Sequence, residues 1–223
     1  MNLLKIILFT LTLVVTGIAT VVHGQETNFR EQNHSNNLVF VDENLQGMVK
    51  EYYETGELKA EIIYQQGNIE SKREFLKNGK LERETRYLED KKYETHIEYY
   101  STGELFRERP LINGKLEGLE KEYYQNGKLK AQRNYKEGKR HGNASGYYIN
   151  GNLQGDWEFS EGVPVKATIF FSSGEKWLEH TDFDKAGRLN GVSKEYNKEG
   201  HFVARRYYKD DVMVKRESVK KWF

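Results

Sequence analysis

A glycine recurs along most of this chain at spacings of 23 to 26 residues, and this period constrains the fold more than any other feature. The segments that carry it are 51–67, 72–91, 97–114, 121–138, 145–162, 168–187 and 193–211. The shared turn glycines are Gly56, Gly79, Gly103, Gly127, Gly151, Gly174 and Gly200. In each repeat, two strand-like runs flank this glycine, which is typical of a β-hairpin. We therefore predict an all-β fold, an elongated antiparallel meander or solenoid of about seven stacked β-hairpin repeats.

The turn residues support hairpins. Asn78–Gly79, Asn126–Gly127 and Asn150–Gly151 place Asn-Gly between two runs, and we predict type I′ turns there because such turns need positive φ at both central residues. A second turn is expected eleven residues later, at Gly67, Gly114, Gly138 and Gly162, with Asp90 and Asp211 in the same slot of two repeats. Gly187 is displaced by two residues, which indicates a small insertion in the sixth repeat.

Period-2 alternation assigns residues to the faces of the predicted sheet. A structural spine of aromatic residues stands four positions before the turn glycines: Tyr52, Phe75, Tyr99, Tyr123, Tyr147, Phe170 and Tyr196. Its expected partners, two positions after the glycines, are Leu58, Leu81, Leu105, Leu129, Leu153 and Phe202. By the same parity, a further aromatic column is expected to share that face: Tyr64, Tyr87, Tyr135, Phe159 and Tyr208.

A second aromatic column, three residues before the turn glycines, is the candidate binding surface. Its aromatic members are Tyr53, Tyr100, Tyr124, Tyr148 and Phe171, with Leu76 and Asn197 at the same position of the other repeats. Adjacent strand residues point to opposite faces, so this column is expected across the sheet from the spine. An open row of tyrosines would suit a strand, a glycan or a partner sheet. The alternative is that a curled sheet or a dimer buries both faces, which would make the column core.

Composition excludes several classes of function. The chain has no cysteine, which excludes disulfides and thiolate chemistry. Its 35 Lys and Arg nearly balance 34 Asp and Glu and alternate in sign along the repeats, which argues against nucleic-acid binding. The six histidines are scattered without metal-ligand spacing, and neither a nucleophile elbow nor a phosphate loop occurs. We therefore expect no catalytic residues, no cofactor and no metal, and the chain is predicted not to be an enzyme.

The N-terminus predicts export. Residues 1–24 have one early basic residue, Lys5, and then an uninterrupted apolar run from Ile6 to Val22. With small residues Val22 and Gly24 before the polar segment, this matches a signal peptide cleaved after Gly24. An uncleaved anchor is the alternative, since 17 residues are at the short limit for a spanning helix. We expect a periplasmic or extracellular protein.

The predicted domain organisation follows from these segments. Residues 1–24 are the signal peptide and 25–37 a polar leader. Residues 38–211 form the repeat array, which begins with a degenerate half-repeat at 38–50. Residues 212–223 form a C-terminal cap or tail, as a strand or a short helix.

Over residues 47–211 the repeats resemble the bacterial variant of the MORN repeat, with its Tyr-Tyr-x-x-Gly-x-Leu core and trailing Tyr-x-x-Gly. The match is most specific at 121–162. The resemblance implies β-hairpin arrays that act as scaffolds, oligomerise or touch membrane surfaces, and it attaches the label of YwqK-type antitoxin components. Tyr-Tyr-x-x-Asn-Gly hairpins also resemble the cell-wall-binding repeats of surface proteins, but Trp157, Trp177 and Trp222 lack the regular spacing of those repeats.

These observations favour an exported, non-enzymatic scaffold that binds another protein or a second copy of itself. The alternative is a module that binds cell-wall glycan or a lipid surface through its aromatic face. A third hypothesis, an antitoxin or immunity protein, depends on the family label alone.

Overall fold

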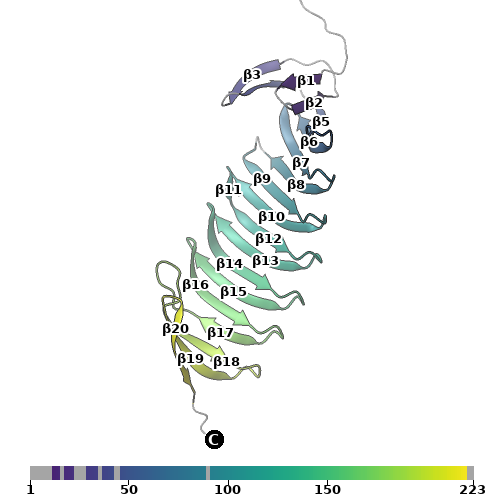
Figure 1. Cartoon of the computed structure of the whole chain (residues 1–223). Coiled ribbons are helices and arrows are strands. Elements are labelled where there is room, and N and C mark those ends of the chain that lie inside the picture. The colour runs from purple at the N-terminus through teal and green to yellow at the C-terminus, as the bar shows by residue number, and fades with distance from the viewer. Residues whose placement is uncertain are drawn as a thin grey trace, which may run out of the picture. The chain divides into compact units, whose positions relative to one another are not determined.

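A computed structural model describes residues 46–88 and 91–219, together with the backbone of four strands before residue 46 (Figure 1). The chain divides into two compact units, Met1–Leu105 and Phe106–Phe223. The described residues contain no helix, and their strands pair antiparallel with neighbours along the chain. The predicted all-β meander of stacked β-hairpins is confirmed.

The strands of unit 1 are β1 (Thr12–Val15), β2 (Ile18–Val22), β3 (Phe29–His34), β4 (Asn37–Asp42), β5 (Gly47–Tyr52), β6 (Leu58–Gln65), β7 (Asn68–Phe75), β8 (Leu81–Leu88) and β9 (Tyr93–Tyr99). Strands β5 to β9 pair in sequence order. Strand β1 pairs with β2, β2 pairs with β5, and β3 pairs with β4. The half-repeat predicted at 38–50 is thus divided between β4 and β5. Much of the predicted signal peptide and polar leader lies outside the described residues, and cleavage stays a prediction.

The strands of unit 2 are β10 (Leu105–Ile112, which begins one residue before the unit), β11 (Lys115–Leu116), β12 (Gly118–Tyr123), β13 (Leu129–Lys136), β14 (Lys139–Tyr147), β15 (Leu153–Ser160), β16 (Val163–Phe170), β17 (Lys176–His180), β18 (Gly191–Tyr196), β19 (Phe202–Lys209) and β20 (Val212–Ser218). They form one meander in chain order from β12 to β20. Among the described residues, no second layer packs on either face of this sheet. Residues 212–218, predicted as part of a cap or tail, are a strand paired with β19.

The turns at the seven shared glycines differ from the prediction. At each, the residue three before the glycine accepts a hydrogen bond from the glycine N–H and donates its own N–H to the residue after the glycine, as with Tyr53, Gly56 and Glu57. Asn78, Asn126 and Asn150 do not have positive φ, so the type I′ prediction is wrong. Their side chains instead accept a hydrogen bond from the N–H two residues on, as Asn126 does from Lys128 at 3.1 Å. Asparagine stabilises this turn through its side chain and not through a left-handed backbone.

Two-residue turns with positive φ at both positions occur at the other end of the strands. They are Gln66–Gly67, Asn113–Gly114, Glu137–Gly138, Glu161–Gly162 and Asp210–Asp211. These are the second turns expected from the sequence, and they have the type I′ signature. Asp90 lies outside the described residues. Gly187 also has positive φ, in a turn inside the 181–190 loop between β17 and β18.

A β-bulge follows most of the shared turns and changes which residues share a face. In β13, Tyr123 pairs with Leu129 but Glu122 pairs with Ala131, so one extra residue separates the two pairs. The leucine partners of the spine were therefore correct, whereas Tyr135 and its equivalents lie across the sheet from them. Tyr208 shows this directly: its ring lies 5.9 Å from that of His180, while Phe202 lies 5.9 Å from Tyr196 on the other side. The shared-face prediction for Tyr64, Tyr87, Tyr135, Phe159 and Tyr208 is wrong because of the bulge.

Candidate functional site

The two faces of the unit 2 sheet differ, and the one that carries Trp157 is here called the tryptophan face. One cross-strand row of this face is Glu120, Arg133, Ala144, Trp157, Ala167, His180, Ser193, Arg206 and Arg216. The next row is Glu122, Ala131, Gly146, Gly155, Ile169, Leu178, Glu195, Ala204 and Ser218. The opposite face carries the spine and is called the spine face. The tryptophan face therefore has a largely apolar middle between two charged ends.

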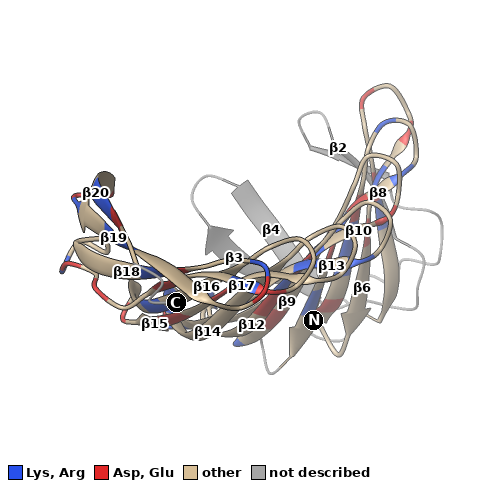
Figure 2. Cartoon of the chain, turned by 90° about the horizontal axis from the view of Figure 1, so that it is seen from below, with Lys and Arg blue, Asp and Glu red and all other residues tan. Residues whose placement is uncertain are grey.

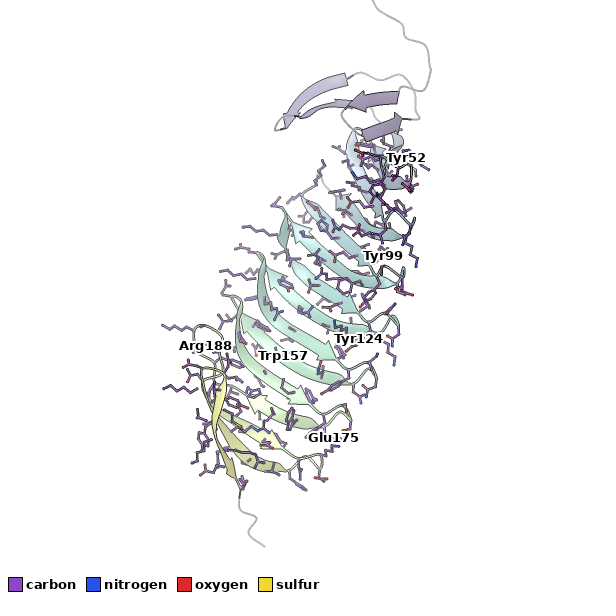
Figure 3. All side chains as sticks on the ribbon, viewed as in Figure 1. Tyr52, Tyr99, Tyr124, Trp157, Glu175 and Arg188 are labelled. Atoms are coloured by element: carbon purple, nitrogen blue, oxygen red, sulfur yellow. The ribbon has the colours of Figure 1, made fainter. Side chains whose placement is uncertain are left out.

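Trp157 lies in the middle of the tryptophan face over small residues. Its cross-strand neighbours are Ala144 and Ala167, both buried. A Cβ added to Gly155 would lie 2.7 Å from Trp157 Cζ3 and closer still to Cη2, whereas one added to Gly146 would lie 3.6 Å from Cζ3. The indole thus lies against the glycine backbone, and only glycine at 155 permits this approach. Figure 3 shows Trp157 and Tyr124 in unit 2, on β15 and in the turn after β12.

Phe171 and Trp177 form an aromatic pair, with ring centroids 5.7 Å apart. The Arg206 guanidinium lies 5.3 Å from the Trp177 ring, and the Lys198 ammonium lies 5.9 Å from the Phe171 ring. Both contacts are within the range of cation–π attraction. Aromatic rings that are half-exposed and fixed by such contacts present apolar area at little cost in side-chain entropy.

At one end of the tryptophan face, Arg133 lies between two buried carboxylates. Its Nη1 donates to Glu120 Oε1 and to Glu122 Oε2, each at 2.9 Å, and Lys130 Nζ lies 2.6 Å from Glu122 Oε1. Burial would raise the pKa of Glu122, but the hydrogen bonds and charges of Lys130 and Arg133 outweigh it, so the pKa is lowered. This N-terminal cluster is neutral, with two acids and two bases.

At the other end, one carboxylate lies between two arginines. Glu195 Oε2 accepts hydrogen bonds from Arg206 Nε at 2.8 Å and Arg216 Nε at 2.7 Å, and Oε1 accepts from Arg216 Nη2 at 3.1 Å. Hydrogen bonds from Arg216 and Arg206 lower the pKa of Glu195 to about 2. This C-terminal cluster has one acid and two bases and therefore carries a net positive charge.

His180 and Ser193 form a buried polar pair next to the C-terminal cluster. A hydrogen bond of 2.5 Å joins His180 Nδ1 to Ser193 Oγ. Burial, and then the nearby Arg206, lower the pKa of His180, so the imidazole is neutral near pH 7. Each polar atom of this hydrogen bond satisfies the other, so the pair is explained by packing.

The column proposed as a binding surface joins one repeat to the next. The hydroxyls of Tyr53, Tyr124 and Tyr148 donate to the carbonyl oxygens of Phe75, Tyr147 and Phe170 at 2.8, 2.7 and 2.9 Å. Tyr100 and Phe171 share the turn position, and all five aromatic residues are half-buried. In unit 2 the column borders the tryptophan face, since Phe171 contacts Trp177 and Lys130 lies 5.9 Å from the Tyr124 ring. The hydroxyls of Tyr53, Tyr124 and Tyr148 thus stabilise the fold by hydrogen bonds to the next repeat, while parts of the rings in this column stay exposed.

The spine residues are also half-buried, on the opposite face. Three of their hydroxyls contact polar side chains of the preceding strand: Tyr123 with Glu108 at 3.4 Å, Tyr147 with Gln132 at 3.3 Å and Tyr196 with Glu179 at 3.0 Å. The most buried apolar residues of unit 2 lie across the sheet instead, and they include Ala131, Ala144, Ala167, Leu178 and Ala204. Sequence reasoning missed these positions because it weighted aromatic size over small residues.

Two further columns were missed and could have been found from their offsets. Glutamate stands five residues before the turn glycine in five repeats, at Glu51, Glu74, Glu98, Glu122 and Glu195. Arginine stands six residues after it at Arg109, Arg133 and Arg206. In the fourth and seventh repeats these two columns meet as the charged clusters described above.

The described residues hold no group of three His, Asp or Glu placed to bind a metal, and no helix among them is long and apolar enough to cross a membrane. A shallow depression of about 250 Å³ between β16 and the 181–190 loop is lined by Val163, Pro164, Val165, Thr181, Phe183, Asp184 and Lys185. Asp184 already accepts hydrogen bonds from Ala186 N–H and Arg188 N–H there. Nothing in this depression forms a constellation for catalysis.

Comparison with known proteins gives a family match for two segments. Residues 45–66 and 116–137 match the model of the MORN repeat variant. These segments contain the β5–β6 and β12–β13 hairpins, so the repeats predicted to resemble that family do so at these two places. No curated protein matches the chain.

Solved structures give only weak likeness. A point mutant of S. aureus TarM in complex with fondaparinux, α-GlcNAc-glycerol and UDP is 10% identical with a TM-score of 0.26, over 48% of this chain and 19% of that one. A second TarM crystal structure is 10% identical with a TM-score of 0.26, over 67% of this chain and 21% of that one. Alternansucrase in complex with isomaltononaose is 15% identical with a TM-score of 0.16, over 86% and 18%. The chain spans about a fifth of those proteins, and such TM-scores do not indicate a shared fold.

Proposed function

We propose that this protein is an exported, non-enzymatic repeat scaffold that binds another protein through the tryptophan face of unit 2. The observation that supports this most is that three aromatic side chains, Trp157, Phe171 and Trp177, are held in place by their neighbours. Trp157 lies against Gly155, and Trp177 is held between Phe171 and Arg206. Aromatic and arginine side chains at the centre of a patch are the residues that dominate protein interfaces.

The surroundings of this area suit a protein partner. The charged clusters at both ends form a polar rim in which each carboxylate has basic partners, so docking would leave no acid unpaired. The MORN repeat match of two segments supports a module used for binding. Export is the part of the proposal that depends on residues 1–24, and N-terminal sequencing of the protein from its source cells would test it, with Gln25 expected as the first residue.

Affinity capture with paired variants tests the binding face. The protein is incubated with cell-envelope proteins beside Phe171→Leu/Trp177→Leu, which keeps apolar side chains at both positions but removes the rings. The control is Tyr196→Leu on the spine face. We expect one discrete partner to be retained by the wild type and by the control, and lost from the double variant.

Protein-free wall and lipid vesicles complete the test. Retention of the wild type on either material, lost in Phe171→Leu/Trp177→Leu, would replace the protein-binding proposal by a glycan- or lipid-binding one. Equal retention of a protein partner by the wild type and the double variant would show that the tryptophan face is not the binding surface.

A further inference from the structure

Two segments of this chain have nearly the same sequence but form different turns. Residues 76–82 read Leu-Lys-Asn-Gly-Lys-Leu-Glu and residues 111–117 read Leu-Ile-Asn-Gly-Lys-Leu-Glu, so only the second position differs. The first Asn-Gly pair lies in the shared turn between β7 and β8, and the second lies in the two-residue turn between β10 and β11. A difference in reactivity between the two asparagines therefore reflects the fold more than the local sequence.

Asn-Gly pairs undergo deamidation, in which the backbone attacks the side-chain amide, because glycine has no Cβ to hinder the approach. A C–N bond forms between the glycine nitrogen and the asparagine Cγ, and the bond from Cγ to Nδ2 breaks. The proton of the glycine N–H leaves with Nδ2 as ammonia, and a succinimide ring remains. Water then hydrolyses one of the two carbonyl–nitrogen bonds of the ring, which gives aspartate or isoaspartate without an oxidant or a reductant.

Asn113 has the backbone conformation that precedes ring closure. Its φ is 50°, and it is the one asparagine with positive φ among the described residues. Rotation of the central peptide plane converts a type I′ turn into a type II′ turn, since φ of the first central residue is positive in both. In the type II′ form the glycine nitrogen lies beside the asparagine Cβ and within reach of Cγ.

The surroundings of Asn113 permit this rotation. Both Asn113 and Gly114 are exposed, and a Cβ added to Gly114 would meet no atom within 4 Å. The side chain of Asn113 forms no hydrogen bond with any described residue. Its amide is therefore available to the glycine nitrogen.

The asparagines of the shared turns are held away from this geometry. Asn78 Oδ1 accepts a hydrogen bond at 3.1 Å from the N–H two residues on, and the Gly79 N–H donates to the Leu76 carbonyl at 2.8 Å. Both reacting groups are therefore engaged in hydrogen bonds. The same two bonds occur at Asn126 and Asn150.

The fifth pair, Asn190–Gly191, is fixed by Asp182. The Asn190 N–H donates to the Asp182 carbonyl at 3.0 Å, and the Val192 N–H donates to Asp182 Oδ2 at 2.9 Å. A Cβ added to Gly191 would lie 2.5 Å from Asp182 Cβ, so the peptide plane has little room to rotate. Among the five pairs, only the one at Asn113 combines positive φ with an unbonded side-chain amide and open surroundings.

We propose that Asn113 is a modification site, which the Gly114 nitrogen and water convert to aspartate or isoaspartate while the other four Asn-Gly pairs stay intact in the folded protein. Figure 2 marks the positions of the basic and acidic residues on the ribbon of the described chain, and the reaction adds one acid to them. Isoaspartate also adds one atom to the backbone between Ile112 and Lys115, which pair across this turn. This inference goes beyond the proposed function, because it concerns a covalent change and not binding.

Prolonged incubation of the purified full-length protein, followed by proteolysis and peptide mass spectrometry, tests this inference. Asn150 is the matched comparison, because isoleucine precedes and glycine follows both it and Asn113. We expect the acid to accumulate at position 113 at least about ten-fold faster than at position 150, since only Asn113 has positive φ and an unbonded amide.

Two controls separate the fold from the local sequence. In denaturant, the two Ile-Asn-Gly sites should react at similar rates, because the conformations that distinguish them are lost. In the folded variant Asn113→Gln, no acid should form at position 113, because the longer side chain closes a larger ring more slowly. Glutamine fits this turn, since Gln66 adopts a φ of 50° at the equivalent position.

Equal rates at positions 113 and 150 in the folded protein, or no acid at position 113, would overturn the inference. So would a lead of position 113 that is as large in the denatured chain, because the turn would then not be its cause. The affinity capture above concerns residues of the tryptophan face, so either proposal can fail while the other stands.

Discussion

The fourth and seventh repeats carry the same glutamate–arginine pair, Glu122–Arg133 and Glu195–Arg206, at the same offsets from their turn glycines. The two pairs are completed in opposite ways. In the fourth repeat a second acid, Glu120, joins the pair, so one arginine lies between two buried carboxylates, with Lys130 as the second base. In the seventh repeat a second arginine, Arg216, joins it, so one carboxylate is held by two bases. The cluster at one end of the face is therefore held together by a base, Arg133, and the cluster at the other end by an acid, Glu195.

The repeats between the two clusters explain why the middle of the face differs. At the glutamate and arginine positions, the fifth repeat has Gly146 and Trp157, and the sixth has Ile169 and His180. Replacement of both charges by a glycine and a tryptophan turns a polar contact into a flat aromatic area. Repetition thus supplies the backbone, while substitution at two positions of each repeat determines what the surface is able to bind.

The largest expected effect is that of Arg133→Met. Loss of the Arg133 guanidinium leaves Glu120 and Glu122 buried beside each other with Lys130 as the remaining base. This should lower the free energy of unfolding by about 3–5 kcal/mol. The matched change is Arg216→Met, which should cost much less because Arg206 still pairs with Glu195. Chemical denaturation of both variants gives the two values. Equal losses would contradict the opposite roles assigned to the two clusters.

Glu195→Gln should have the next largest effect and a defined pH dependence. Since the pKa of Glu195 is lowered from 4.5 to about 2 in the folded protein, its charge stabilises the fold above pH 4.5 by up to about 3 kcal/mol. This contribution is lost as the pH falls from 4.5 toward about 2. The difference in unfolding free energy between wild type and variant should therefore shrink over that range, measured by denaturation at several pH values. A difference that is independent of pH would show that the pairing with Arg206 and Arg216 is not what Glu195 contributes.

Gly155→Ala tests the aromatic area between the clusters. The new methyl group would overlap the Trp157 ring and should destabilise the fold by about 1–3 kcal/mol. Gly146→Ala is the matched control, because its methyl group would only touch the ring at 3.6 Å and should change stability by less than about 1 kcal/mol. Thermal unfolding and tryptophan fluorescence would report both stability and ring environment. If the two variants behave alike, Trp157 does not lie against Gly155.

The smallest effect is expected at a junction between repeats. Tyr124→Phe removes the hydrogen bond to the Tyr147 carbonyl and should cost about 1 kcal/mol. Tyr135→Phe is the control: no hydrogen bond of its hydroxyl occurs among the described residues, and a change near zero is expected. Denaturation midpoints measure both. An unchanged denaturation midpoint for Tyr124→Phe would indicate that ring packing alone joins the fourth and fifth repeats.

Much of the fold could be predicted from the sequence, because the glycine period, the two kinds of turn and the spine with its leucine partners follow from local chemistry. The prediction of which residues share a face failed because of one extra residue in each hairpin. The bulge after the turn, as at Lys130, moves Tyr135 and Tyr208 to the other face, and simple alternation does not contain that step. The asparagines were assigned a backbone role, although the type I′ geometry lies at the opposite turns, where Glu137 and Glu161 adopt positive φ.

The candidate site was less predictable, since it depends on contacts between repeats. Tyr53, Tyr124 and Tyr148 were named as a candidate binding surface, with burial in the core as the alternative. The acceptors of their hydroxyls belong to the next repeat and are known only once the register is fixed. Trp157 looked irregularly placed in the sequence. Its role follows from its packing against Gly155 and beside the alanines of the neighbouring strands, which the sequence alone does not show. The glutamate and arginine offsets were visible, but they became informative only when the structure brought both columns together.

Site-specific photo-cross-linking tests the central claim, protein binding by the tryptophan face, most directly. Gln154 is exposed on this face near Gly146, and Glu158 is exposed on the spine face of the same strand. Each is replaced in turn by the photoreactive residue p-benzoylphenylalanine, and the protein is irradiated with proteins of its source cells. We predict one discrete covalent product from Gln154→p-benzoylphenylalanine, suppressed by excess unmodified protein, and none from Glu158→p-benzoylphenylalanine. Products from position 158 alone, or from neither position, would contradict the account.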